Sequence, residues 1–189
     1  MAVRFARKSI QSAKVLGLDV STKTGAVLLD SSLPELGIEG LAKELSLKPL
    51  DNGTTENRVF RASELFTTVR QLLFLHKPDL VAIEGYGYAN VHTLAILVEL
   101  GTMVRYACIV QETPFLDVPP TVLKKYVTGK GNTKKDQMRL AVYKKWGYEH
   151  KSDNVVDAYA LSRIGFLWLG VTPPANKLEK EVLSKLRKP

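Results

Sequence analysis

The sequence has little of the chemistry on which several protein classes depend. Of its 189 residues, one is a cysteine, Cys108, and three are histidines. A single cysteine excludes an internal disulfide, which is typical of proteins from reducing compartments. No group of cysteines and histidines offers a zinc site. The most apolar windows, 94–110 and 161–171, are interrupted by charged residues such as Glu99 and Arg163, so neither a signal peptide nor a membrane span is predicted.

What the chain has in excess is positive charge. Lysine and arginine total 27 against 19 acidic residues, which gives a net charge of +8 and an isoelectric point near 9.5. Such an excess suits a polyanionic partner, because each neutralised phosphate releases condensed counterions. Many basic proteins nevertheless bind no nucleic acid. Charge alone therefore leaves the class of partner open.

The length fits one domain, which we place at residues 14–170, between a basic flexible arm at 1–13 and a basic C-terminal tail at 171–189. The tail is expected to be partly disordered. Apolar runs predict strands at 14–20, 25–29, 79–83 and 115–118, with a further strand within 44–50. Helical spacing predicts helices at 57–76, 91–110, 119–127, 134–146 and 153–168. This order predicts an α/β domain with a mixed five-stranded sheet flanked by helices.

Four acidic residues stand out because of their positions. Asp19 lies at the end of one apolar strand and Glu84 at the end of another, while Asp153 and Asp157 are four residues apart on a helix. A buried carboxylate is costly unless a cation accompanies it, and like charges four apart on a helix repel each other. Hard carboxylate oxygens suit Mg²⁺ or Mn²⁺, and two such ions promote phosphodiester hydrolysis.

Each acid also has a simpler explanation. Asp19 would begin a turn, and Glu84 would pair with a nearby lysine. Asp153 would cap its helix, and Asp157 would lie in solvent. Taken singly, these alternatives are as reasonable as a metal site. All four together require separate coincidences, so the sequence favours a site that binds divalent cations.

At this point the chain resembles the RuvC family of Holliday junction resolvases, over residues 15–164. The segment GLDVSTKTG matches the family's first strand, with Asp19 at the metal-binding aspartate, and AIEGY matches its second acidic strand, with Glu84 at the catalytic glutamate. VTGKGNTKKDQM resembles the family's glycine loop and the helix after it. DAYA, beginning at Asp157, matches the closing helix.

The resemblance implies an RNase H-like fold and a metal-dependent endonuclease of DNA recombination and repair that cuts Holliday junctions or other branched DNA. It implies two Mg²⁺ ions per site, for which Mn²⁺ substitutes, held by Asp19, Glu84, Asp153 and Asp157. It also implies 5′-phosphate and 3′-hydroxyl ends, and a homodimer that cuts two strands symmetrically. One position departs from the pattern: where the family has an acid or histidine three residues before the last aspartate, this chain has Asn154. We expect Asp153 to be the fourth ligand, because helical spacing brings it beside Asp157, with Asn154 as the alternative.

DNA contacts are expected around the glycine loop and after Glu84. Two glycines let backbone amides approach a phosphate, and lysines gather beside them. Related resolvases place an aromatic residue after the catalytic glutamate, where it stacks on unpaired bases. The candidate DNA-binding residues are Lys124, Lys125, Lys130, Lys134, Lys135, Tyr86 and Tyr88. Of these, the resemblance singles out Lys124 and Lys135. A solvated lysine-rich loop and ordinary aromatic packing are the alternatives.

Other functions compete with this interpretation. The segment after Asp19 also resembles the first phosphate loop of actin-like ATPases and sugar kinases, but a second such loop is missing and nucleotide binding leaves Asp153 and Asp157 unexplained. The YqgF-like nucleases are a closer alternative, and a non-catalytic DNA-binding relative is another. We expect a location in the cytoplasm or nucleoid of a bacterium or a phage-infected host, or in an organelle matrix.

Overall fold

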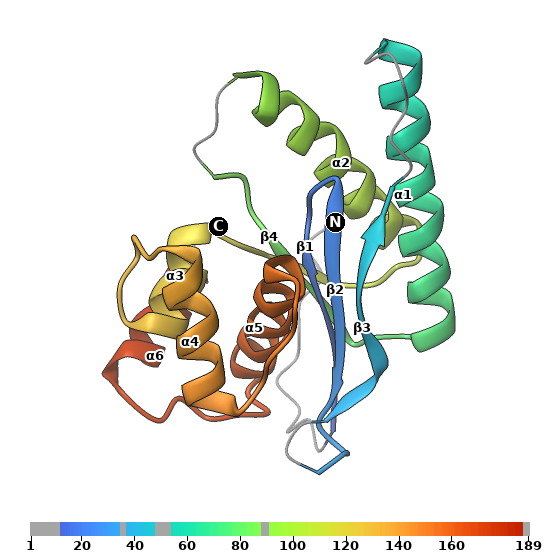
Figure 1. The fold of residues 1–189 in the computed structure, drawn as a ribbon. Coiled ribbons are helices and arrows are strands. Elements are labelled where there is room, and N and C mark those ends of the chain that lie inside the picture. Colours follow the sequence, from blue (N-terminus) through green and yellow to red (C-terminus); the bar gives the residue numbers. More distant parts are fainter. Residues whose placement is uncertain (1–11, 35–36, 48–53, 88–90, 187–189) are drawn as a thin grey trace.

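The computed structural model describes residues 12–34, 37–47, 54–87 and 91–186. Five strands form one mixed sheet in the order β3-β2-β1-β4-β5 (Figure 1). The hairpin β1–β2 and the pair β2–β3 are antiparallel, whereas β4 and β5 run parallel to β1. The strands are β1 (Lys14–Asp19), β2 (Lys23–Asp30), β3 (Ile38–Ser46), β4 (Leu80–Glu84) and β5 (Phe115–Val118). The expected mixed five-stranded sheet is confirmed.

Helices cover both faces of this sheet. One face carries α1 (Thr55–His76) and α2 (Val91–Val110). The other face carries α5 (Asp153–Leu169), and beside it lie α3 (Pro120–Thr128), α4 (Lys135–Trp146) and α6 (Lys177–Leu186) (Figure 1). Alternating strand side chains supply two separate cores, because neighbouring residues of a strand point to opposite faces. Strand residues an even number of positions apart lie on the same face. The residues of β1 and β4 that pack on α5 therefore show on which face the acids at the ends of these strands lie.

The central helix α5 approaches the sheet closely. A Cβ atom added at Gly17 of β1 would overlap the carbonyl oxygen of Ala158 and the side chain of Ser162. The Ser162 hydroxyl donates to the Val27 carbonyl across this contact, at 2.9 Å. A glycine at position 17 is thus required for the close approach of α5 to the sheet. This packing holds the beginning of α5 against the end of the sheet where β1 and β4 terminate.

Most predicted elements agree with the structure within a few residues, and the helix 91–110 and the strand 115–118 agree in full. The third strand is the exception, since β3 begins at Ile38, well before the predicted 44–50. The C-terminal tail, for which partial disorder was expected, contains the amphipathic helix α6, whose Val182 and Leu183 are buried. Of the N-terminal arm, residues 1–11 lie outside the described residues, and Ala13 is buried.

Helix α2 is apolar although much of it is exposed. Its segment Thr93–Val110 is long and apolar enough to cross a membrane by length and composition, and 28% of it is buried. Its two charged residues join it to the domain: Arg58 of α1 forms an ion pair with Glu99, and Arg105 forms one with Asp117 of β5. One apolar helix docked in this way is weak evidence for a membrane span. Its apolar residues Val91, Val98, Tyr106 and Ile109 remain exposed.

Candidate active site

Two acidic side chains lie together at one end of the sheet. Asp19 is the last residue of β1 and Glu84 is the last residue of β4. These parallel strands are neighbours, and Leu18 pairs with Ile83. Asp19 and Glu84 come next in their strands, so they lie at the same edge of the sheet. Alternation places both on the α5 face, where Ala82 also packs. Asp19 is 8% exposed and Glu84 is half-buried. Their positions are compatible with a shared ligand.

The first turn of α5 brings the other predicted residues to this edge. Ser152 caps the helix by accepting a hydrogen bond from the Val155 amide, and acidic residues in a first turn are favoured by the helix dipole. The Asn154 side-chain amide donates to the Lys23 carbonyl at 2.7 Å. This bond ties α5 to the β1–β2 turn. Asp157 lies one turn further along, half-buried.

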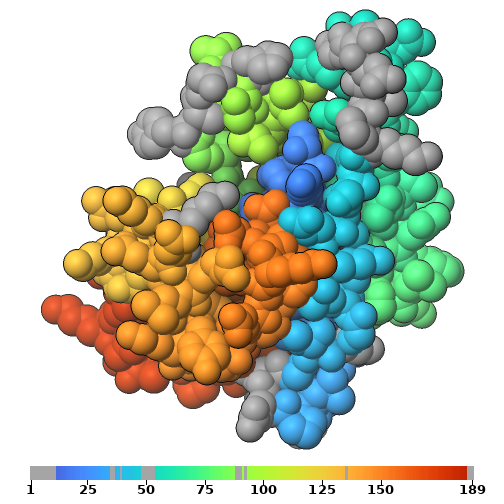
Figure 2. Space-filling view, viewed as in Figure 1, coloured from blue at the N-terminus to red at the C-terminus, as the bar shows by residue number. Residues whose placement is uncertain are grey.

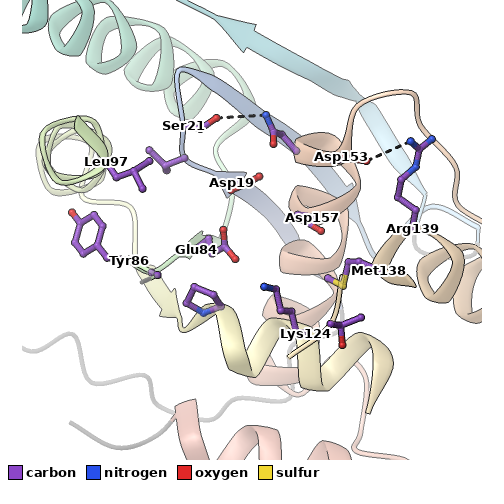
Figure 3. Close-up of a pocket in the computed structure, with 16 residues that line it drawn as sticks. Asp19, Ser21, Glu84, Tyr86, Leu97, Lys124, Met138, Arg139, Asp153 and Asp157 are labelled. Atoms are coloured by element: carbon purple, nitrogen blue, oxygen red, sulfur yellow. Dashed lines mark hydrogen bonds and ion pairs between the residues drawn. The ribbon is translucent and has the colours of Figure 1, made fainter. Parts of the chain in front are cut away.

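These residues border a pocket of about 300 Å³ between the sheet edge and the helices α2, α3, α4 and α5. The surface is hollowed between the β1–β2 turn and α2 on one side and the helices α3–α5 on the other (Figure 2). Asp19, Glu84 and Asp157 surround the pocket, and Lys124 of α3 extends toward it (Figure 3). Its lining is Asp19, Val20, Ser21, Glu84, Gly85, Tyr86, Gly87, Leu97, Pro120, Lys124, Thr133, Met138, Arg139, Asp153, Asn154 and Asp157. All four predicted acids are among them.

The donor set fits a divalent cation. Three carboxylates from different elements, those of Asp19, Glu84 and Asp157, supply hard oxygens of the kind that Mg²⁺ and Mn²⁺ prefer. Within the described part of the chain, no three acidic, histidine or cysteine side chains already lie close enough to enclose a cation. The carboxylates therefore border the pocket and do not form a closed cage.

The predicted DNA-binding lysines differ in their surroundings. Lys124 lines the pocket. Lys125, the next residue on α3, instead lies 2.6 Å from Glu181 of α6. Lys130 and Lys134 are exposed outside the pocket lining, and the Lys135 side chain lies outside the described residues. Only part of the expected cluster thus faces the acids.

The glycine loop is closed by two threonines. The hydroxyls of Thr128 and Thr133 are 2.7 Å apart, and both contact the Lys130 carbonyl. Gly129 has φ 81°, a left-handed conformation that glycine adopts at little cost. Thr133 also lines the pocket. The loop is a hydrogen-bonded turn that joins α3 to α4 beside the acids.

Tyr86, predicted to contact bases, is held in place by α2. Its hydroxyl accepts a hydrogen bond from Arg105 at 3.1 Å, and the guanidinium lies over the ring, 4.9 Å from its centre. Asp117 fixes that arginine in turn, with Nε 3.0 Å from the carboxylate. A Cβ at Gly101 would lie 2.7 Å from the tyrosine hydroxyl, so the ring requires a glycine there. Tyr86 remains 42% exposed. Tyr88 lies outside the described residues.

The sequence did not single out several residues of the pocket. Arg139 of α4 is the most notable, because it places a second positive charge beside the acids. Ser21 and Leu97 are others. A basic residue in the middle of a lysine-rich helix carries no sequence signal of its own. Only the packing of α4 beside α5 reveals that Arg139 faces the pocket.

The chain is similar in sequence to several known proteins. A family model described as crossover junction endodeoxyribonuclease RuvC matches residues 44–163, a segment that contains Glu84 and Asp157 but not Asp19. RuvC of Carboxydothermus hydrogenoformans is 27% identical over 159 residues, 82% of this chain and 91% of that protein. RuvC of Gloeobacter violaceus is 30% identical over 121 residues, 62% of this chain and 68% of that protein. RuvC of Campylobacter hominis is 29% identical over 155 residues, 79% and 92% of the two chains.

Solved structures share the architecture. Thermus thermophilus RuvC in complex with a Holliday junction substrate matches with a TM-score of 0.60 at 20% identity, over 79% of this chain and 90% of that one. The yeast mitochondrial Holliday junction resolvase Ydc2 matches with a TM-score of 0.56 at 17% identity, over 92% and 84%. These likenesses confirm the expected RNase H-like fold. Since the family model covers more than half of the sequence and a relative 30% identical is covered over two thirds of its length, the chain belongs to the crossover junction endodeoxyribonuclease RuvC family.

Proposed function

We propose that this protein is a divalent-metal-dependent DNA endonuclease that resolves Holliday junctions or closely related branched DNA. The observation that carries the proposal is the meeting of Asp19, Glu84 and Asp157, from two strands and a helix, in one pocket that Lys124 also lines. Membership of the RuvC family supports the same activity. A cytoplasmic location, where the DNA of a bacterial cell lies, suits it.

The acids have the role of cation ligands in this proposal. Asp19, Glu84 and Asp157 would hold two Mg²⁺ ions, for which Mn²⁺ substitutes. Cations held there would supply activation of a water molecule and would offset the charge that develops on the leaving oxygen. The products are expected to carry 5′-phosphate and 3′-hydroxyl ends.

The basic and aromatic residues would hold the substrate. The Lys124 ammonium, in the pocket wall, is suited to a backbone phosphate next to the scissile bond. Lys125, Lys130, Lys134 and Lys135 are proposed to contact phosphates further out. Tyr86, oriented by Arg105, and Tyr88 would contact bases near the exchange point, since an exposed aromatic ring stacks on an unpaired base.

A cleavage assay tests the proposal. The full chain is incubated with a labelled four-way junction, a fork, a flap and a linear duplex of the same sequence, in Mg²⁺, Mn²⁺, Ca²⁺ or EDTA. We expect paired nicks in the junction with Mg²⁺ or Mn²⁺, no cleavage in EDTA, and weak cleavage of the duplex. DNA ligase should reseal the nicks, because it requires 5′-phosphate and 3′-hydroxyl ends.

Two outcomes would contradict the proposal in different ways. Tight junction binding without cleavage in either metal would indicate a DNA-binding relative that has lost the reaction. Hydrolysis of ATP without any cleavage would favour a nucleotide-binding function. Preference for forks or flaps over junctions would keep the chemistry and change only the natural substrate.

The exposed side of α2 suggests that the protein forms a homodimer. Val91, Val98, Tyr106 and Ile109 are exposed and follow one another at intervals of seven, eight and three residues, so they share one side of the helix. An apolar stripe of this kind is typical of protein interfaces. A two-fold dimer would present two pockets to the two strands of a junction.

Replacing Ile109 with glutamate should weaken this dimer. A charge in the apolar stripe is left unpaired in the interface, and we expect dissociation to increase by about tenfold or more. Light scattering after gel filtration measures the mass, which should be twice 21.0 kDa for the wild type. Leu140→Glu is the control, because Leu140 is similarly exposed on α4. A monomeric wild type would refute the dimer.

A further inference from the structure

Arg139 lies in the wall of the candidate active site, on the α4 side. Its Nη1 atom is 3.4 Å from Oδ1 of Asp153 (Figure 3). Its Nη2 atom donates a hydrogen bond of 3.1 Å to the carbonyl oxygen of His150, in the connection between α4 and α5. A guanidinium has five N–H donors, more than these two contacts use. Two contacts thus orient the group while it keeps donors for a ligand.

Asp153 is engaged with this arginine. Its Oδ1 atom is buried and, among the described residues, accepts no hydrogen bond, and a buried carboxylate oxygen is costly unless a positive group lies beside it. The guanidinium of Arg139, on α4, is the positive group that lies beside it. The neighbouring Asn154 is occupied as well, because its amide is bonded to the β1–β2 turn. Both residues at the expected fourth ligand position are therefore already engaged by other groups of the protein.

We propose that Arg139 contacts a substrate phosphate in this site, and that Asp153 is a positioning residue that holds Arg139 in place and not a cation ligand. The inference rests on the proposed endonuclease function. An arginine fork matches the geometry of phosphate oxygens, and it keeps its charge at any physiological pH. Together with Lys124, it would hold the backbone on the side of the pocket facing α3 and α4.

Salt dependence of DNA binding tests the phosphate contact. Junction affinity is measured by fluorescence anisotropy in EDTA, at several salt concentrations, for the wild type, Arg139→Gln and Asp153→Asn. Loss of one phosphate contact should reduce the slope of log K against log salt by about 0.9. We expect this reduction for Arg139→Gln and a wild-type slope for Asp153→Asn, which keeps the arginine. A wild-type slope for Arg139→Gln would overturn the proposal.

Binding of Mn²⁺ to the DNA-free protein tests the role of Asp153. Calorimetry or the electron paramagnetic resonance signal of free Mn²⁺ gives the affinity. Asp153→Asn should stay within about twofold of wild type. Asp157→Asn, the matched change one helical turn away, should weaken Mn²⁺ binding by about tenfold or more. Even replacing a residue that only orients a metal ligand weakens metal binding by that factor. Equal weakening by the two variants would make Asp153 a cation ligand and overturn the proposal.

Turnover of the junction tests whether the two residues act together. Arg139→Gln should lower turnover by about tenfold to a hundredfold, the effect of losing a charge-assisted hydrogen bond to the phosphate. Asp153→Asn should lower turnover by up to the same factor, because the ion pair that orients the guanidinium is lost. The double variant should be no slower than Arg139→Gln, because positioning matters only while the arginine is present. Additive losses would overturn the coupling. If Arg139→Gln fails to fold in a thermal melt, Arg139→Lys replaces it and should retain the salt slope while losing turnover.

The proposed function and this inference fail in different ways. A wild type that cleaves no branched DNA contradicts the function. A wild type that cleaves, combined with Mn²⁺ binding that depends on Asp153, contradicts only the inference.

Discussion

Replacing Asp19 with asparagine should lower cleavage of a four-way junction by about a thousandfold or more, which corresponds to several kcal/mol of transition-state stabilisation. Asp19 is 8% exposed at the end of β1 and lies on the same edge as Glu84. The amide keeps the shape of the side chain but removes the charge that a divalent cation requires. Single-turnover cleavage with saturating protein measures the chemical step. Glu84→Gln should have an effect of similar size.

Asp30 provides a matched control for this experiment. It is also 8% exposed and lies on β2, outside the pocket lining. Although burial alone would raise its pKa, hydrogen bonds from Ser32 and the charge of Lys14 hold the pKa below the usual value. Asp30→Asn should therefore cost stability in a urea titration and leave the single-turnover rate of the folded protein unchanged. Equal rates for Asp19→Asn and the wild type would contradict the metal site.

The lowered pKa of Asp30 predicts how the effect of Asp30→Asn on the free energy of unfolding depends on pH. A carboxylate whose pKa is lower in the folded than in the unfolded state stabilises the fold above its unfolded pKa, and this contribution disappears as the pH falls through the folded value. The stability difference between the wild type and Asp30→Asn should accordingly shrink on acidification. Urea unfolding at neutral and at acidic pH measures it.

The sequence was sufficient for the parts of the fold that are locally determined. Asp19 and Glu84 could be placed because each ends a continuous apolar run, and a parallel arrangement brings such ends to one edge. The edge strand β3 was harder to locate. It has a register shift against β2 between Val27 and Leu29, and Gly40 adopts φ 65° within it. These irregularities remove the alternating pattern from which a strand is recognised.

The C-terminal helix and the arginine contact were not predicted, for different reasons. Helix α6 does carry a helical pattern, since Val182, Leu183 and Leu186 are spaced for one face, but the helix is short and gains its stability by packing on the core that α3 and α5 build. Propensity is a weak guide to such a helix, because tertiary contacts supply its stability. The pairing of Arg139 with Asp153 likewise depends on how α4 packs beside α5. The candidate acids could be recognised from the local sequence pattern, whereas the residues that surround them in space could not.

Replacing Gly25 with alanine should disturb both stability and catalysis. A Cβ atom at this position of β2 would overlap the carbonyl group of Asn154 and lie 2.8 Å from the amide nitrogen of Val155. Backbone atoms in a helix cannot move singly, so the first turn of α5 must shift away from the sheet. Gly25 also pairs with Asp19 in the β1–β2 ladder. The shift therefore separates the acids of α5, such as Asp157, from those of the strands.

We expect Gly25→Ala to lower the free energy of unfolding by about 2–4 kcal/mol. This is at or above the usual cost of overpacking a core position, because the added atom meets backbone. Among molecules that remain folded, single-turnover cleavage should still fall by about tenfold or more, because small displacements of catalytic groups are costly. Gly87→Ala is the control for stability alone, since its Cβ would meet only Pro120, at 3.5 Å. If the Gly25→Ala variant has the stability and the cleavage rate of the wild type, α5 does not pack on β2 as described. The position of Asp157 beside Asp19 would then not depend on this contact.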